Sequence, residues 1–292
     1  MNKHLLMVAI TAGCASTSGA VLAGIGEDTA RALTRQYHDT REACAGNSPA
    51  FKCSGILLRT TKPSLAYHTW DHSPNSREKG GVSFSYMRAD APIQRLAGSG
   101  KSGYILMPDS LKKPEALAYE VLCAYPTDGD SWYRDRGGCG DNSRTSDTEM
   151  FCQEIGVRTA GEWFEKYTFT PGHSGERYYS QCAFDMSESR GAEATKEFYG
   201  TLRLMKLLRG DPFPWNEVMV KAWDENHAHR LPIQAFFYVK NKHGSGDYAR
   251  HDQQDFYAQT GRFIPIIEID LHNRKGPTFI YKPSVQSMKE PG

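Results

Sequence analysis

Residues 56–61 and 81–88 contain an arginine and two serines that could together bind a charged ligand. The stretch ILLRTT places Arg59 directly after three aliphatic residues, which predicts a buried strand that ends on a cation. The stretch GVSFSYMR predicts a second strand, in which Ser83 and Ser85 share one face because side chains alternate along a strand. If the two strands are neighbours, a guanidinium and two hydroxyls line one cleft, which suits a planar ligand that carries phosphates.

Aromatic residues near these strands favour a ring as part of that ligand. His68 and Trp70 lie in the stretch YHTWD, and Tyr86 follows Ser85 on the second strand. We interpret these three residues as walls of the cleft. The residues alone also allow a simpler interpretation, in which Arg59 reaches water from a strand end and the serines face solvent on an edge strand.

Other chemical motifs are incomplete. The stretch GSGKS at 98–102 lacks the first glycine of a nucleotide-hydrolase phosphate loop and precedes a strand-like run. The pairs His68 with His72 and His227 with His229 have no obvious third ligand, so no metal site is predicted. No G-x-S-x-G motif occurs, so a hydrolase nucleophile elbow is not supported.

Charge and length limit the class of protein. The 292 residues include 35 Lys and Arg against 34 Asp and Glu, which argues against a nucleic-acid groove or a polybasic membrane patch. The length is sufficient for one sizeable core. We therefore look for partners at a local cleft and expect no nucleic-acid partner.

The N-terminal residues 1–23 resemble a secretory signal peptide. A short basic start, an apolar run and the small-residue pattern Val21-Leu22-Ala23 predict cleavage before Gly24 and a secreted or periplasmic protein. The alternative is a lipoprotein site at Cys14. No later segment is apolar over the roughly 18 residues that a membrane helix needs, so no stable membrane insertion is predicted.

The cysteines support export. Removing Cys14 leaves an even set that suits up to three disulfides, with fifteen pairings open: Cys44, Cys53, Cys123, Cys139, Cys152 and Cys182.

Periodicity predicts an α+β fold with short strands and several helices, as a single domain over residues 24–292. The predicted strands are 56–59, 82–86, 104–107, 119–123, 233–239, 263–271 and 278–281, and the predicted helices are 27–43, 159–167, 192–208 and 215–225. Residues 126–148, rich in Gly, Asp and Ser, read as a loop held by Cys139.

Several segments resemble one family. The segments ILLRTT, YHTWDHSP, GGVSFSYMR, LPIQAFFY and DQQDF, in this order over most of the mature chain, are similar to the halovibrin-type secreted bacterial proteins. The resemblance implies an NAD glycohydrolase, which cleaves the bond between nicotinamide and ribose. It also implies ADP-ribosyl transfer to an acceptor, such as a host or competitor protein. NAD would be the substrate, with no bound cofactor.

The wider arginine–serine–glutamate class of ADP-ribosyltransferases suggests roles for individual residues and a split β core. Arg59 resembles the arginine of its first strand, and Ser83-Phe84-Ser85 resembles its Ser-Thr-Ser strand. For the carboxylate of its late loop, Gln253-Gln254-Asp255 is the nearest match and Glu268 is the rival. Asp255 or Glu268 would stabilise the oxocarbenium-like transition state, while Gln253 would position water or an acceptor.

A competing class is a non-enzymatic secreted binding or adhesion protein with the same cleft. Such a protein would leave its ligand unchanged and tolerate neutral substitutions at Asp255 and Glu268.

Overall fold

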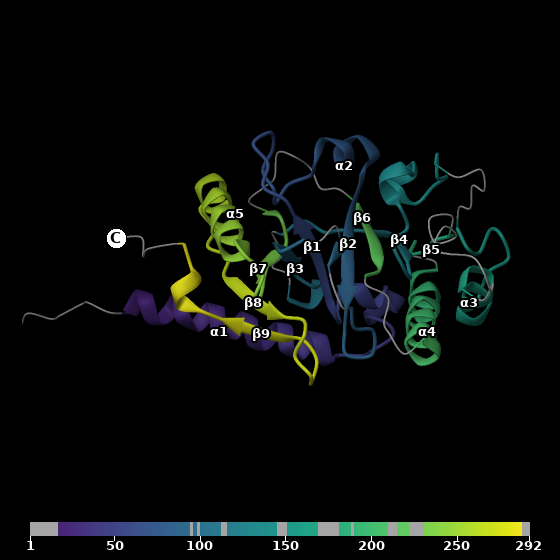
Figure 1. The fold of residues 1–292 in the computed structure, drawn as a ribbon, viewed down its shortest axis with the longest axis horizontal. Coiled ribbons are helices and arrows are strands. Elements are labelled where there is room, and N and C mark those ends of the chain that lie inside the picture. Colours follow the sequence, from purple (N-terminus) through teal and green to yellow (C-terminus); the bar gives the residue numbers. More distant parts are fainter. Residues whose placement is uncertain are drawn as a thin grey trace, which may run out of the picture.

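The computed structural model describes residues 17–93, 96–97, 100–111, 116–144, 151–168, 181–187, 190–209, 215–221 and 230–287. Within these ranges the chain has an α+β fold, with five α-helices and one nine-stranded mixed sheet (Figure 1). The helices are α1 (Thr17–His38), α2 (Pro74–Lys79), α3 (Ala160–Thr168), α4 (Gly191–Arg209) and α5 (Ser245–Thr260). The strands are β1 (Ile56–Thr61), β2 (Gly81–Met87), β3 (Ser102–Leu106), β4 (Val121–Tyr125), β5 (Phe184–Asp185), β6 (Glu217–Lys221), β7 (Ile233–Val239), β8 (Ile266–Asp270) and β9 (Thr278–Tyr281). The predicted fold class is confirmed.

The sheet joins strands from both ends of the chain. Its order is β5-β4-β6-β2-β1-β3-β7-β8-β9, and every neighbouring pair is antiparallel except β7 with β8. Helix α5 is the crossover that a parallel pair requires. Because β1 and β2 lie in the middle, the residues predicted to form a cleft are central to the sheet.

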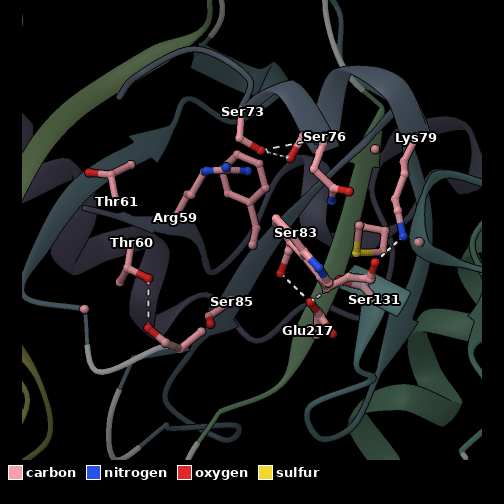
Figure 2. Close-up of a pocket in the computed structure, with 18 of the residues that line it drawn as sticks. Arg59, Thr60, Thr61, Ser73, Ser76, Lys79, Ser83, Ser85, Ser131 and Glu217 are labelled. Atoms are coloured by element: carbon pink, nitrogen blue, oxygen red, sulfur yellow. Dashed lines mark hydrogen bonds between the residues drawn. The ribbon is translucent and has the colours of Figure 1, made fainter. Parts of the chain in front are cut away.

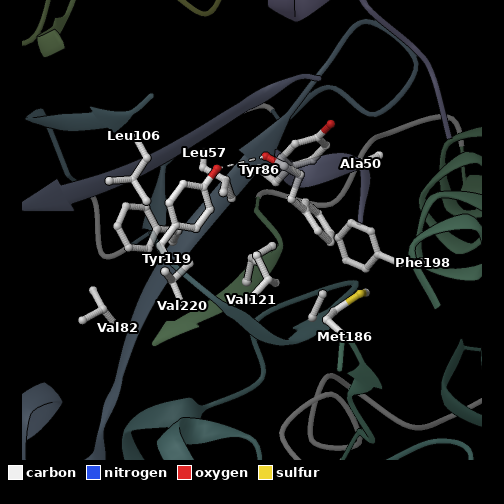
Figure 3. Close-up of a cluster of buried hydrophobic side chains, with 14 of the residues drawn as sticks. Ala50, Leu57, Val82, Tyr86, Leu106, Tyr119, Val121, Met186, Phe198 and Val220 are labelled. Carbon is white, nitrogen blue, oxygen red and sulfur yellow. Dashed lines mark hydrogen bonds between the residues drawn. The ribbon is translucent and has the colours of Figure 1, made fainter. Parts of the chain in front are cut away.

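Apolar residues on both faces of the sheet explain which helices cover it. Helix α1 buries Ala30, Leu33 and Tyr37, the stripe that its sequence predicts, in one hydrophobic cluster with Leu58 and Phe237. A second, larger cluster lies on the opposite face and includes side chains of α4 and α5. Figure 3 shows part of this cluster, in which Leu57, Val82, Tyr86 and Val220 come from three neighbouring strands. The larger cluster therefore extends across β1, β2 and β6.

Strand β7 shows why the apolar runs of the sequence form strands here. All seven of its residues are buried, and Phe236 and Phe237 belong to the two opposite clusters. A strand covered on both faces reads as a continuous apolar run. The prediction over 233–239 is confirmed at both ends.

Three disulfides use the six predicted cysteines. They pair Cys44 with Cys53, Cys123 with Cys139, and Cys152 with Cys182. The second of them joins β4 to the loop predicted to be held by Cys139. Disulfides of this kind fit an oxidising compartment.

Helix α3 begins with a capping box. The Thr159 hydroxyl accepts a hydrogen bond from the Glu162 amide at 3.3 Å, and the Glu162 carboxylate accepts one from the Thr159 amide at 2.9 Å.

One predicted element is wrong. Residues 215–225 were predicted as a helix, but 217–221 form β6, which pairs with β2 on one side and β4 on the other. Val218 and Val220 face the larger hydrophobic cluster, so the short run follows the alternation of a strand. The remaining part, 222–225, lies outside the described residues.

The predicted signal-peptide boundary falls within α1, which begins at Thr17 and continues past Gly24. Residues 1–16, including Cys14, lie outside the described residues, as do His227 and His229. In the part of the chain that the structure describes, no helix is long and apolar enough to cross a membrane.

Candidate functional site

The sheet splits between β1 and β2. Their paired residues run from Ile56 with Met87 to Leu58 with Ser85. Beyond this point β1 continues in register with β3, and β2 continues in register with β6. A pocket of about 720 Å³ lies where the two strands separate, a volume within the range of small-molecule sites, and residues of both strands line it.

The split brings together side chains that start on opposite faces of the sheet. Leu58 pairs with Ser85, so both point to one face, and Arg59 is the next residue along β1. Arg59, Ser83 and Ser85 nevertheless all line the pocket, because the strands have parted at this level (Figure 2). The predicted shared cleft of these three residues is present in the structure.

The surrounding loops pack closely on the parted strands. The Thr60 hydroxyl donates to the Ala97 carbonyl oxygen at 3.0 Å beside β1. On the other side, a Cβ at Gly81 would lie 1.9 Å from the carbonyl oxygen of Gly137. Only glycine permits this contact, which holds the 3₁₀ turn Arg136–Gly138 against the start of β2.

Glu217 is the buried carboxylate of the pocket. It stands at the start of β6, and its Oε1 accepts hydrogen bonds from the hydroxyls of Ser83 and Ser131, both at 2.6 Å. Its Oε2 accepts a bond from the Gly129 amide at 2.9 Å. Figure 2 shows Glu217 between Ser83 and Ser131. All three donors are neutral, so the carboxylate is held in place without an ion pair to any cation of the described residues.

Two effects oppose these hydrogen bonds. Burial raises the pKa of the Glu217 carboxyl, and the nearby Asp128 carboxylate raises it further, whereas the three donors favour the ionised form. Burial also raises the pKa of Asp128, which lines the same pocket. The charge of Asp128 therefore opposes ionisation of Glu217.

The loop after β4 carries most of the groups around Glu217. Gly129 and Ser131 donate to Glu217, and the side chain of Gln181 holds the Asp128 carbonyl oxygen at 2.9 Å. Lys79 of α2 donates to the backbone oxygens of Trp132 and Arg134. These two hydrogen bonds position the loop. Burial lowers the pKa of the Lys79 ammonium.

Arg59 is a cation without a carboxylate partner among the described residues. Its Nε is buried and has no hydrogen-bond acceptor in that part of the chain. It pairs across the strands with Tyr104, whose pKa burial raises to about 12 even though the charge of Arg59 lowers it. Unpaired buried donors are rare in folded proteins, so Arg59 is free to bind an anion.

Asp255 of α5 forms a separate cluster with His68 and Trp70, which lie in the loop between β1 and α2. Asp255 Oδ2 lies 2.6 Å from His68 Nδ1 and accepts a bond from Trp70 Nε1 at 2.7 Å, and the two rings stack at 4.8 Å. Thr69, between them, donates to Asp252 and lines the pocket. Asp255 and Trp70 thus support the segment that carries Thr69. The predicted residues Asp255, His68 and Trp70 do not themselves line the pocket.

The remaining predicted residues have structural partners elsewhere. Glu268 of β8 accepts hydrogen bonds from Tyr238 at 2.8 Å and Lys282 at 2.6 Å. Gln253 lies within α5, not at its start, and bonds the Ile264 carbonyl oxygen at 2.6 Å. Tyr86 is buried in the larger cluster and donates to the Ser54 carbonyl oxygen at 2.9 Å.

Sequence analysis missed Glu217, Asp128 and Ser131. The alternating stretch EVMVK was the available signal for Glu217, since it places the glutamate and Met219 on one face and the valines on the other. Asp128 and Ser131 lie in a loop, which has no such pattern. Among the described residues, no three His, Cys, Asp or Glu side chains group as a metal ion would require.

No protein-family model and no curated protein matches the chain.

Proposed function

We propose that the chain is an exported enzyme that cleaves the bond between nicotinamide and ribose in NAD. The proposal rests on the Ser83–Glu217 hydrogen bond, which is made across adjacent strands in the pocket. The same pocket contains Arg59, which has no carboxylate partner among the described residues. NAD has complementary charges, an anionic pyrophosphate and a cationic nicotinamide ring. The pocket offers the Arg59 guanidinium for the first and the Glu217 carboxylate for the second.

In this proposal Arg59 binds the pyrophosphate. A guanidinium forms two parallel hydrogen bonds to phosphate oxygens, and Arg59 has no competing carboxylate among the described residues. Ser85, which lines the pocket and pairs with Leu58 at the end of the β1–β2 ladder, orients the ligand.

Glu217 stabilises the charge that develops during cleavage. When the C1′–N bond breaks, its electron pair leaves with nicotinamide, which becomes neutral, and positive charge spreads over the ribose. A carboxylate fixed by Ser83 and Ser131 needs no reorganisation to face that charge. Water then adds to C1′, and the Glu217 carboxylate accepts a proton from that water, which completes hydrolysis.

The resemblance to halovibrin-type proteins and to the arginine–serine–glutamate class supports the same assignment, with one change of residue. Glu217 takes the role predicted for Asp255 or Glu268, because it bonds the first serine of the Ser-Phe-Ser strand and lines the pocket. Transfer of ADP-ribose to a host or competitor protein would replace water by an acceptor side chain. The three disulfides support export.

Release of nicotinamide from NAD by the purified, disulfide-bonded chain tests the proposal. We expect release by the parent and a loss of about tenfold to a hundredfold in kcat/KM for Arg59→Ala, because hydrogen bonds to a charged group are lost. Arg31→Ala, at an exposed position of α1, is the matched control and should keep full activity. Binding of NAD without any release would instead favour the non-enzymatic binding protein.

A further inference from the structure

A second cavity, of about 510 Å³, lies beside the turn between β8 and β9. It shares no lining residue with the pocket between β1 and β2. In Figure 1 the β8–β9 turn lies at the lower edge of the molecule, whereas α2, next to the first pocket, lies at the upper edge. Four separate parts of the chain line it: the end of α1, the loop after β2, α4 and the turn 271–277. We call it the cationic cup.

The side chains that line the cationic cup are strongly biased in charge. Lys206, Arg274 and Lys275 carry basic side chains, and the imidazoles of His38 and His272 lie in the same lining. None of the described lining residues is acidic. On a chain with a net charge of only +1, this is a local concentration of positive charge.

Lys206, Arg274 and Lys275 have no carboxylate partner within the described residues, whereas the His272 imidazole lies close enough to Asp270 for their charges to interact. The carboxylates near the cup are already engaged by other cations. Asp90 pairs with Arg88 at 2.5 Å and Arg203 at 2.9 Å, and Asp270 pairs with Lys240 at 2.7 Å. The charge of the cup is therefore not balanced from within.

The turn that carries two of the cations is fixed by its own hydrogen bonds. The Asn273 carbonyl oxygen accepts the Gly276 amide at 3.0 Å, and its side-chain oxygen accepts the Lys275 amide at 2.9 Å. Gly276 has a φ of 104°, which favours glycine, and a Cβ there would lie 3.4 Å from Tyr37 Oη. The turn packs against buried Tyr37 and holds the backbone of Arg274 in place.

We propose that the cationic cup binds a small anion with two neighbouring phosphate groups. Like charges gathered without acids repel one another, and an anion removes that repulsion while gaining hydrogen bonds from an arginine fork and two ammonium groups. The cavity is large enough for a diphosphate with an organic group attached. The proposal does not depend on NAD cleavage in the other pocket.

Calorimetric titration with inorganic pyrophosphate tests the proposal. All variants carry Arg59→Ala, so that the first pocket does not contribute an anion site. We expect one saturable site in this background, weakened at least about tenfold by Arg274→Ala with Lys275→Ala, because two charge-assisted contacts are lost. Both residues are exposed on the turn, so the fold should persist, which an unchanged Tm would verify.

The matched control is Arg31→Ala with Lys196→Ala, which removes the same charge from exposed helix positions outside the cup. It should weaken binding by less than about twofold, since only long-range charge is lost. Absence of saturable binding, or equal weakening by the two double variants, would overturn the proposal. Tighter binding of ADP than of pyrophosphate would support it and identify a nucleotide as the source of the diphosphate.

Discussion

Two buried glutamates on strands, Glu217 of β6 and Glu268 of β8, have opposite surroundings. Glu268 bonds the ammonium of Lys282 and the hydroxyl of Tyr238, and lies outside the pocket. Glu217 bonds two serine hydroxyls and one amide, and lines the pocket. Glu268 is therefore balanced by a cation of its own chain, whereas Glu217 has no such partner among the described residues and can interact with whatever enters the pocket.

Burial alone therefore does not identify a functional carboxylate. A buried glutamate with a lysine partner is unavailable to a ligand, and removing either member of such a pair destabilises the fold. A glutamate held by neutral donors is fixed in position but still unneutralised, which is what stabilising a developing cation requires.

Substitution of each glutamate by glutamine gives the largest contrast. Under the proposed function, Glu217→Gln should lower kcat for nicotinamide release by about a hundredfold to a thousandfold, since the fixed carboxylate is lost. Glu268→Gln should leave kcat of the folded protein nearly unchanged. Steady-state assays on samples with verified Tm values measure both, and equal losses would contradict the contrast.

Stability should show the reverse order. Glu268→Gln should lower the free energy of unfolding by about 2 kcal/mol, because charge-assisted hydrogen bonds to Lys282 and Tyr238 weaken. Urea unfolding with Lys282→Met as a second variant measures the loss. If the pair acts as a unit, the double variant should lose less than the sum of the single losses.

Removing a donor from Glu217 should have a smaller effect. Ser131→Ala deletes one 2.6 Å hydrogen bond to the carboxylate, which should cost about 1 to 2 kcal/mol in transition-state stabilisation. It should also move the acidic limb of the kcat/KM profile to higher pH, because the donor favours the ionised form. A profile with an unchanged acidic limb would argue against Glu217 as the ionising group.

Asp128→Asn should move the same limb in the other direction. The amide oxygen can still accept the bond from the Asp130 amide, while the charge that raises the pKa of Glu217 disappears. The acidic limb should therefore move to lower pH, with plateau turnover nearly unchanged. A shift to higher pH would contradict the assignment.

Glu217 and Asp128 should also make the free energy of unfolding depend on pH. Because the pKa of Glu217 is raised in the folded protein, its contribution to stability is full below the unfolded value, about 4.5, and is lost as pH rises through the folded value. Asp128→Asn should reduce that loss. Urea unfolding at acidic and neutral pH compares the two chains.

The sequence predicted the parts of the site that belong to regular strands. Ser83 and Ser85 share a face because side chains alternate along a strand, and Arg59 follows a buried aliphatic run. All three residues could therefore be assigned to strands without knowledge of tertiary contacts. The position of the carboxylate could not be predicted in this way. The stretch EVMVK is too short to separate strand from helix, and its pairing with β2 and β4 decides the outcome.

Asp255 illustrates a different limit, in which a sequence motif suggested a role that the tertiary contacts do not support. Its neighbours resemble a motif, yet its carboxylate is engaged by His68 and Trp70, which lie far away in the sequence. Only tertiary contacts distinguish an acid that supports the loop beside the pocket, such as Asp255, from one that lines the pocket, such as Glu217. The cationic cup depends on tertiary structure in the same way, since its lining comes from four distant segments.

The short seam between β1 and β2 has a consequence for how the pocket could change. Three residue pairs join the two halves of the sheet there, while the larger hydrophobic cluster spans both halves on one face. The gap is therefore set by the volume of side chains such as Leu57 and Tyr86, which touch no ligand. Under the proposed function, repacking the interior beneath the seam should alter the substrate range, with every group in the pocket left in place.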